Sequence, residues 1–230
     1  MKKILLITQG SQAIQLIREF YSLGIKPKDL TVLTLNETGR NIINYDFSNL
    51  SFLRFIQYYK INFEFISDLT FDDILSKHAS LNDIVISFSN PFIIKEGVLN
   101  KSTFINFHPG ILPNYRGSLS TVWSMLNNED YVGGTWHYIE KRVDTGNILS
   151  QHKIPVTPTS TAFSLNHKIF SKGISEIGNV LELVNAEDKG IKQEGKSRFY
   201  YNKFPSLTKE DKWDDDLKSR VNYFPPSFVD

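Results

Sequence analysis

The chain has 230 residues, of which 40% are hydrophobic and 22% are charged, and this is the ordinary balance of a globular protein. A formal net charge of +1 gives no electrostatic basis for binding nucleic acid or an anionic membrane surface, so we expect neither partner. The absence of cysteine excludes disulfides, thiolate metal sites and cysteine nucleophiles, and it fits a reducing cytoplasm.

The N-terminal stretch MKKILLITQGSQ does not have the features of a targeting signal. Its apolar run is only about five residues long and ends in polar residues, which argues against a signal peptide. Nowhere does the sequence approach the roughly 20 consecutive apolar residues of a membrane span. We therefore expect a cytoplasmic protein.

The first 35 residues predict the opening of a parallel sheet. Residues 3–8 (KILLIT) form a continuous apolar run, which is typical of a strand buried on both faces. After a Gly-Ser turn, apolar residues recur at helical spacing over 13–23, and Gly24 ends that helix. Residues 31–35 (TVLTL) are the next strand. This order predicts an α/β fold of the Rossmann-like, doubly wound type with a mostly parallel sheet.

Further elements follow along the chain. Residues 36–60 have a mixed composition that gives no firm assignment. Aspartates in the first turn favour a helix at 70–78 through the helix dipole. The Asp-Thr-Gly turn at 144–146 predicts two antiparallel strands around it. The remaining predictions are strands at 63–66, 83–88, 104–107, 134–140 and 147–155, and helices at 118–127 and 160–183.

The composition changes after Gly195. Aromatic and proline-rich stretches there surround the charged segment KEDKWDDDLK, and the whole is too short for a second domain. We predict a catalytic domain over 1–195 and a C-terminal aromatic-rich β extension over 196–230, which could form a hairpin. An exposed aromatic cluster would suit a subunit interface, so we expect a homodimer.

The segment 105–117, INFHPGILPNYRG, carries the strongest functional signal. Asn106 and His108 lie two positions apart on a strand, so their side chains share a face, and a Pro-Gly break follows. Ligands of open α/β folds bind outside the carboxyl ends of the strands. A lone histidine is more often a buried core residue, but the asparagine, the strand-end position and the break together favour a site.

Asp144, in KRVDTGNIL, supplies a carboxylate. Taken alone, Asp-Thr-Gly is simply a good turn. Together, the three side chains make an acid/base constellation. The Asn106 amide could donate to a developing oxyanion. The His108 imidazole could move a proton or polarise a carbonyl, and Asp144 could orient the histidine or relay a proton through water.

Two other readings of these features are disfavoured. The chain has five histidines, but no two stand at a ligand spacing such as His-x3-His, so we expect no metal. The first loop, TQGSQ, lacks Gly-x-Gly-x-x-Gly, which argues against a dinucleotide-dependent dehydrogenase.

INFHPGILPNYRG followed by GGTWHYIEKRVDTGNIL resembles the catalytic core of the folate-dependent formyltransferases. The resemblance covers residues 80–160 well and the N-terminal half more loosely. It implies catalysis by Asn106, His108 and Asp144, with 10-formyltetrahydrofolate as the formyl donor and no metal. It also implies that two loops hold the pterin, mainly through backbone groups. These cofactor-binding residues would be Ser87, Phe88, Ser89, Asn90 and Phe92 in the first loop, and Ile139, Glu140, Lys141, Arg142 and Val143 in the second.

Three branches of that family compete. Methionyl-tRNA formyltransferase has a sizeable C-terminal domain, whereas few residues follow Gly195 here and the net charge is near zero. Glycinamide ribonucleotide formyltransferase has a glycine- and asparagine-rich first loop, unlike TQGSQ. The sugar N-formyltransferases are similar in length, in the HPG-x-LP-x-YRG motif and in a tail like FYYNKFPSL. We therefore favour the sugar branch.

The resemblance to the sugar branch also suggests residues for the acceptor. Tyr115 and Arg116 could either line the acceptor pocket or clamp their own loop. Lys203 and Arg198 could either bind the pyrophosphate or only keep the surface soluble. Trp136 lies within a predicted strand, so we expect it to pack in the core. The candidate substrate-binding residues are Gly10, Ser11, Gln12, Tyr115, Arg116, Gly117, Arg198, Tyr201 and Lys203.

The resemblance leads to a specific expectation for the acceptor. It is a dTDP-linked 4-amino-4,6-dideoxyhexose, namely dTDP-4-amino-4,6-dideoxyglucose, a precursor of a formamido sugar in bacterial surface polysaccharide such as O-antigen. The alternatives are a 3-amino isomer, a GDP-linked sugar, or glycinamide ribonucleotide. Two hypotheses do not involve formyl transfer to an acceptor. One is a folate-binding protein without turnover, and the other is a hydrolase that releases formate.

Overall fold

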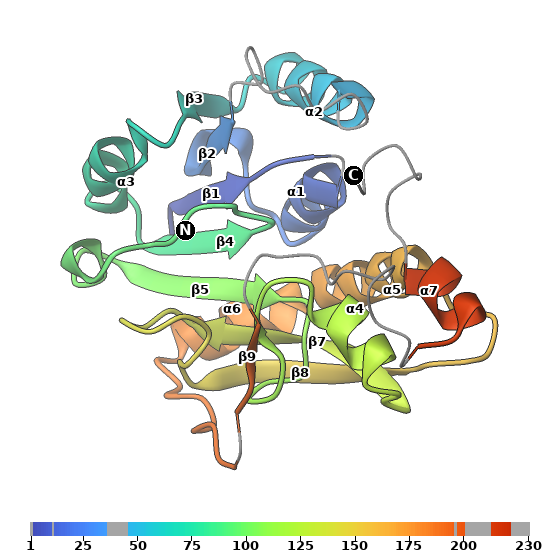
Figure 1. The fold of residues 1–230 in the computed structure, drawn as a ribbon. Helices are drawn as coiled ribbons and strands as arrows, with labels where there is room; N and C mark the ends of the chain where they lie inside the picture. Colours follow the sequence, from blue (N-terminus) through green and yellow to red (C-terminus); the bar gives the residue numbers. More distant parts are fainter. Residues whose placement is uncertain (1, 11, 36–45, 196, 201–212, 222–230) are drawn as a thin grey trace.

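A central sheet dominates the computed structural model (Figure 1). The structure describes residues 2–10, 12–35, 46–195, 197–200 and 213–221, and for 46–51 the backbone alone. The described residues form a seven-stranded sheet of order β3-β2-β1-β4-β5-β7-β8. Its first five strands pair in parallel, and β7 and β8 join antiparallel. The predicted doubly wound α/β fold is therefore confirmed.

The strands lie close to the predicted ranges. The sheet contains β1 (Ile4–Thr8), β2 (Leu30–Leu35), β3 (Asn62–Ile66), β4 (Ile84–Phe88), β5 (Thr103–His108), β7 (Tyr131–Tyr138) and β8 (Ile148–Pro155). A second, two-stranded sheet pairs β6 (Arg116–Gly117) with β9 (Phe199–Tyr200) in parallel. This small sheet brings residues 199–200 to the loop that follows β5.

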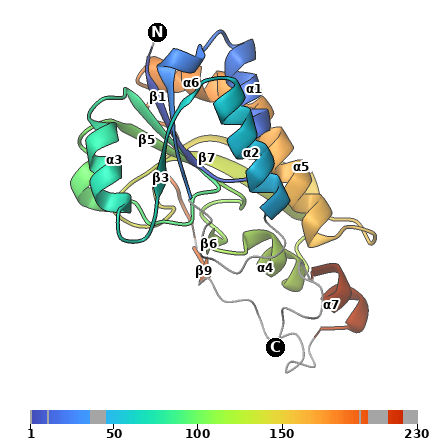
Figure 2. The same cartoon turned by 90° about the horizontal axis from the view of Figure 1, so that it is seen from above.

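Helices cover both faces of the large sheet. They are α1 (Gln12–Ser22), α2 (Asp46–Tyr58), α3 (Phe71–Ala79), α4 (Ser120–Leu126), α5 (Ala162–Ser175), α6 (Ile177–Asn185) and α7 (Asp215–Val221), with short 3-10 helices η1 (Pro27–Asp29) and η2 (Glu96–Val98). Figure 2 shows α3 on one side of the sheet and α1, α2 and α5 on the other.

Strand β1 is buried on both faces, as its apolar run predicts. Its side chains alternate between two core clusters: Leu6 packs in the cluster with α1 and α5, and Leu5 packs in the cluster with α3. The core therefore lies in two layers, one on each face. In open α/β folds, ligands bind outside the carboxyl ends of the parallel strands, so a site is expected at that edge of the sheet.

Two helical regions differ from the sequence prediction. The segment 160–183 is not one helix but two, because the chain bends at Glu176, which ends α5 and begins α6. The region 36–60, which gave no assignment, contains α2. Its Phe52 and Ile56 are one turn apart and fully buried, but its asparagine and aromatic content hides this pattern.

The described part of the C-terminal extension, residues 197–200 and 213–221, contains the two-residue strand β9 and helix α7. The predicted hairpin stays a prediction. Trp213, Leu217 and Val221 are buried in the same core cluster as α1 and α5, because the four-residue spacing of the last two gives α7 an apolar face. The boundary at 195 stays a prediction. Within the described ranges, no helix is both long and apolar enough to span a membrane.

Candidate active site

Strand β5 presents Asn106 and His108 on one face and Phe107 on the other. Asn106 and His108 point to the side of α3, while Phe107 between them packs against Trp136 and Phe170 in the opposite core layer. Trp136 is fully buried, as predicted. The loop that joins β7 to β8 carries Asp144 back over the same face as Asn106 and His108.

His108 is buried, and both ring nitrogens have defined surroundings. Its Nε2 lies 2.7 Å from the carbonyl oxygen of Tyr115 and 3.2 Å from Oγ of Ser120, whose hydroxyl donates to the same carbonyl at 2.8 Å. A carbonyl only accepts, so Nε2 carries the proton. Nδ1 then faces Oδ2 of Asp144 at 3.4 Å.

Asp144 is held ionised. Burial by itself would raise the pKa of its carboxyl, but the imidazoles of His108 and His137 and the backbone N–H of Gly117 together lower that pKa well below its usual value. The Gly117 N–H donates to Oδ2 at 2.8 Å. The site therefore has a permanent negative charge at its centre.

His137 is a site residue that the sequence analysis missed. It pairs with Asn106 across β5 and β7, and its Nε2 lies 3.1 Å from Nδ2 of Asn106 and 3.5 Å from Oδ1 of Asp144. Its Nδ1 donates to the Tyr138 carbonyl at 2.7 Å, so Nε2 accepts from Asn106. The available signal was strand alternation: with Trp136 in the core, His137 had to face the other way.

The charge state of His108 follows from burial. Burial lowers the pKa of His108 below its ordinary value, His137 acts in the same direction, and Asp144 and the Tyr115 carbonyl oppose them. The imidazole is neutral near pH 7, with the lone pair of Nδ1 beside the Asp144 carboxylate. Such a nitrogen can accept a proton, and the carboxylate stabilises the imidazolium that results.

The two predicted cofactor loops flank this centre. Ser87 lies beside Asn106 in the parallel register, and the Asn90 side chain holds the backbone N–H and C=O of Phe92 at 3.0 Å each. The side chain of Phe88 lies in the core, so only its backbone can face a ligand. In the second loop, Ile139 binds the Phe104 carbonyl through its N–H, and the next four residues, 140–143, donate no backbone hydrogen bond to any other described residue.

The predicted acceptor residues separate into three groups. Gly10 and Gln12 lie half-buried after β1, and Arg198 is exposed. Tyr115 is buried and donates its hydroxyl to Glu129, which is the clamp geometry. Arg116 donates to Gln193 at 2.7 and 3.2 Å, and Gly117 binds Asp144. Ser11, Tyr201 and Lys203 lie outside the described residues.

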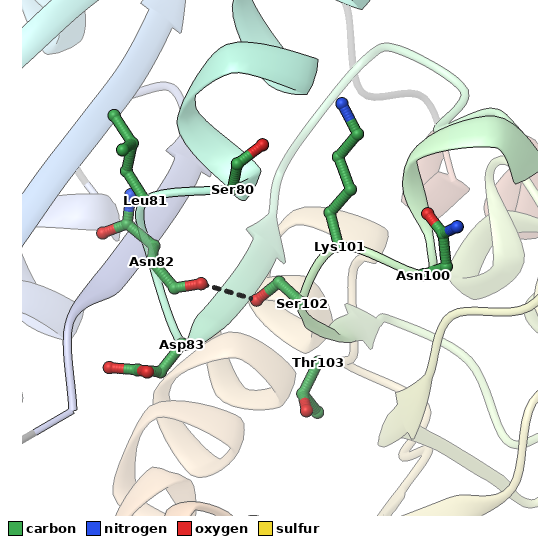
Figure 3. Close-up of a pocket in the computed structure, with 8 residues that line it drawn as sticks. All are labelled: Ser80, Leu81, Asn82, Asp83, Asn100, Lys101, Ser102 and Thr103. Atoms are coloured by element: carbon green, nitrogen blue, oxygen red, sulfur yellow. Dashed lines mark hydrogen bonds between the residues drawn. The ribbon is translucent and has the colours of Figure 1, made fainter.

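A polar pocket lies at the opposite end of the sheet, where β4 and β5 begin (Figure 3). Ser80, Asn82, Lys101 and Ser102 are among its lining residues, and Ser102 donates to the Asn82 carbonyl at 3.0 Å. It contains none of the predicted site residues. We therefore place the candidate site at Asn106, His108 and Asp144.

Comparisons with known proteins find similar formyl transferases. Residues 75–181 match the family model described as formyl transferase. The chain is 27% identical over 231 residues to the GDP-perosamine N-formyltransferase of Brucella melitensis, with 97% of this chain and 86% of that protein covered.

Solved structures are similar as well. WlaRD, a sugar 3N-formyl transferase, has 25% identity and a TM-score of 0.69, with 88% of this chain and 70% of that chain covered. An N-formyltransferase from Helicobacter canadensis has 23% identity and a TM-score of 0.69, with 88% and 71% covered. Residues 75–181, which carry the site, therefore match the formyl transferase family, and the chain is a transferase enzyme.

Proposed function

We propose that this protein transfers a formyl group from 10-formyltetrahydrofolate to the amine of a nucleotide-linked amino sugar. The observation that carries this proposal is the neutral, buried His108 whose Nδ1 faces an ionised Asp144. Attack by an amine requires a group that removes its proton, and we assign this role to Nδ1 of His108. Asp144 then stabilises the imidazolium.

Asn106 has the complementary task. One hydrogen of its Nδ2 is committed to His137 at 3.1 Å, which fixes the amide orientation. The second hydrogen is available for the negative charge that develops on the formyl oxygen during attack. The pair Asn106–His137 is therefore a pre-oriented donor next to the base.

The loops around the site fit the donor. A pterin presents a row of hydrogen-bonding groups on a flat ring, and the backbone of 140–143 offers N–H groups that no other described residue uses. Ile93 and Val143 are apolar and exposed on these loops, so they could cover the faces of a ring. The donor supplies the formyl group, and Ser87 to Phe92 and Ile139 to Val143 would hold it.

The acceptor assignment draws on the relatives. One acts on GDP-perosamine, and the Helicobacter canadensis protein was solved with folinic acid and dTDP-3-aminofucose. These two differ in nucleotide and in amine position, so an amino sugar on a nucleoside diphosphate is their shared feature. Within that class we propose dTDP-4-amino-4,6-dideoxyglucose. A homodimer, a cytoplasmic location and a role in surface polysaccharide are proposed with it.

Mass spectrometry of acceptor mixtures tests the proposal. The protein is incubated with 10-formyltetrahydrofolate and dTDP-, GDP- and UDP-linked amino sugars, together with glycinamide ribonucleotide. A formyl mass gain on one nucleotide sugar supports the proposal and names the acceptor. Formylation of glycinamide ribonucleotide alone would make this a purine enzyme. Formate release without any formylated acceptor would indicate a hydrolase.

A further inference from the structure

Gln193 lies between α6 and β9, and its side-chain amide contacts the turn that carries Asp144. Its Nε2 donates to the carbonyl oxygens of Asp144 at 3.0 Å and Gly146 at 2.7 Å. Its Oε1 accepts from Nε and Nη2 of Arg116 at 3.2 and 2.7 Å. Both protons and both lone pairs of the amide are therefore used.

These contacts close a ring through the active site. Arg116 directly precedes Gly117, whose N–H binds Oδ2 of Asp144 at 2.8 Å. The ring runs from the Asp144 carboxylate through Gly117, Arg116 and Gln193 back to the Asp144 carbonyl. Asp144 is thus held at its side chain and at its backbone, and rotation of either breaks a hydrogen bond.

The turn needs such support. Asp144 has a φ of 54°, in the left-handed region that costs energy for a residue with a side chain. Gly146 is pressed so closely to β7 that an added Cβ would lie 1.9 Å from the Tyr138 carbonyl oxygen. The hydrogen bonds from Gln193 to the carbonyls of Asp144 and Gly146 hold the turn in this conformation.

Gln193 is itself presented by a fixed backbone, residues 189–195, which we call the strap. Ile191 exchanges two N–H···O bonds of 2.8 Å with Ile148, and Asn147 donates to the Lys189 carbonyl at 2.7 Å. The strap is therefore anchored to the start of β8, directly after the Asp144 turn.

We propose that Gln193 is a positioning residue, which holds the Asp144 turn so that its carboxylate faces Nδ1 of His108, and that the strap thereby completes the active site. The proposal deepens the proposed function and rests on it for the role of His108. Its geometric part concerns only the distance between Asp144 and His108, and it is measurable without any substrate.

The test compares Gln193→Leu, which keeps the side chain neutral, shortens it by one atom and removes all four hydrogen bonds, with Lys192→Ala. Lys192 is the exposed neighbour on the same strap, so it is a matched control. Thermal unfolding confirms that each variant is folded. Should Gln193→Leu not fold, Gln193→Asn, which shortens the side chain and keeps the amide, replaces it.

Nitrogen-15 NMR titration of His108 in the substrate-free protein is the first readout. Asp144 favours the imidazolium, so a displaced carboxylate makes His108 titrate at lower pH than in the wild type, while Lys192→Ala matches the wild type. An unchanged titration in Gln193→Leu overturns the proposal. This readout is independent of the acceptor, so it stands even if no amino sugar is formylated.

Steady-state kinetics are the second readout. We expect kcat to fall by roughly 10–100-fold in Gln193→Leu, with both KM values near those of the wild type, because a misplaced catalytic group slows the chemical step. Raised KM values with an unchanged kcat would make Gln193 a binding residue and overturn the proposal. A wild type that formylates no acceptor counts against the proposed function, and the NMR titration then decides on Gln193.

Discussion

The carbonyl oxygen of Tyr115 lies 2.7 Å from Nε2 of His108, and this contact decides which nitrogen of the imidazole faces Asp144. A carbonyl cannot donate, so the proton stays on Nε2 and the lone pair on Nδ1. Tyr115 therefore contributes to the site through its backbone, while its side chain is buried against Glu129 and Asn127. The buried Tyr115 side chain thus fixes the position of the carbonyl that orients His108.

Replacing the proposed base or its partner should abolish most turnover. We expect His108→Asn and Asp144→Asn each to lower kcat by at least ~100-fold, because one removes the proton acceptor and the other the charge that stabilises the imidazolium. The measurement is initial-rate kinetics with the identified acceptor, and circular dichroism confirms folding. His167→Asn, at an exposed position on α5, is the control and should retain activity. Near-native turnover of either site variant would remove that residue from the mechanism.

The pH dependence of catalysis follows from the burial of His108. The base acts in its neutral form, and burial lowers its pKa, so the neutral form persists to lower pH. We expect the acid limb of the profile of kcat/KM against pH to lie below the ordinary histidine value of about 6.5. An acid limb at or above that value would show that another group, or a protonated His108, controls the reaction.

The same burial makes stability depend on pH. Because the pKa of His108 is lower in the folded than in the unfolded chain, the unfolded chain binds the proton first as pH falls below about 6.5. The contribution of His108 to the free energy of unfolding should therefore be constant above that value and fall below it, down to the folded-state pKa. Urea denaturation at a series of pH values measures this slope. His108→Asn should flatten it, and an equal slope in that variant would assign the effect to other groups.

Thr135 should be important for stability through its hydroxyl. It is fully buried, donates to the Gly110 carbonyl at 2.7 Å, and accepts from Gln151 Nε2 at 2.9 Å and from the Leu112 N–H at 3.3 Å. Thr135→Val leaves these partners unpaired, so we expect the free energy of unfolding to fall by about 1–3 kcal/mol. Thr135→Ser, which keeps the hydroxyl, should lose less. Equal losses in the two variants would assign the effect to packing.

Two helical glycines give a matched pair. A Cβ at Gly173 would lie 2.2 Å from the ring of Phe107, the residue between Asn106 and His108, whereas at Gly178 the nearest atom is a methyl of Leu23 at 3.2 Å. Gly173→Ala should destabilise by roughly 1–3 kcal/mol through overpacking, despite the better helix propensity of alanine. Gly178→Ala should be neutral or stabilise by up to about 1 kcal/mol. Thermal or urea unfolding distinguishes the two outcomes.

Local sequence patterns were sufficient for much of the sheet. Runs such as ILLIT and DIVISF predict buried strands because parallel strands need apolar side chains on both faces. Helix α2 was missed because its apolar positions, Phe52 and Ile56 among them, are diluted by polar and aromatic neighbours. The break at Glu176 is flanked by Gly173 and Gly178, but no proline or glycine stands at the break itself. That carboxylate lies 3.1 Å from His152 on β8, a contact between distant segments.

The residues of the candidate site also divide into those that the local sequence predicts and those that it does not. The spacing of Asn106 and His108 on one strand predicts that they share a face, and the Asp-Thr-Gly segment supplied Asp144 as their candidate carboxylate, which the resemblance also implied. Strand alternation could have predicted that His137 faces the site, but no sequence pattern could have predicted the role of Gln193. Nothing in the local sequence GIKQEG marks it, because its role depends on contacts with Arg116, Asp144 and Gly146, which are far away in the chain.

The parallel pairing of β6 with β9 has a consequence for biosynthesis. Residues 116–117 leave the ribosome long before their partners 199–200. The loop after β5 can therefore form its pairing with β9 only after most of the chain has been synthesised. The large sheet can assemble earlier, since β1 to β8 all precede the strap. A nascent chain that has reached only α6 would thus hold His108 in a folded strand beside an Asp144 turn not yet fixed, and catalytic competence would arrive last.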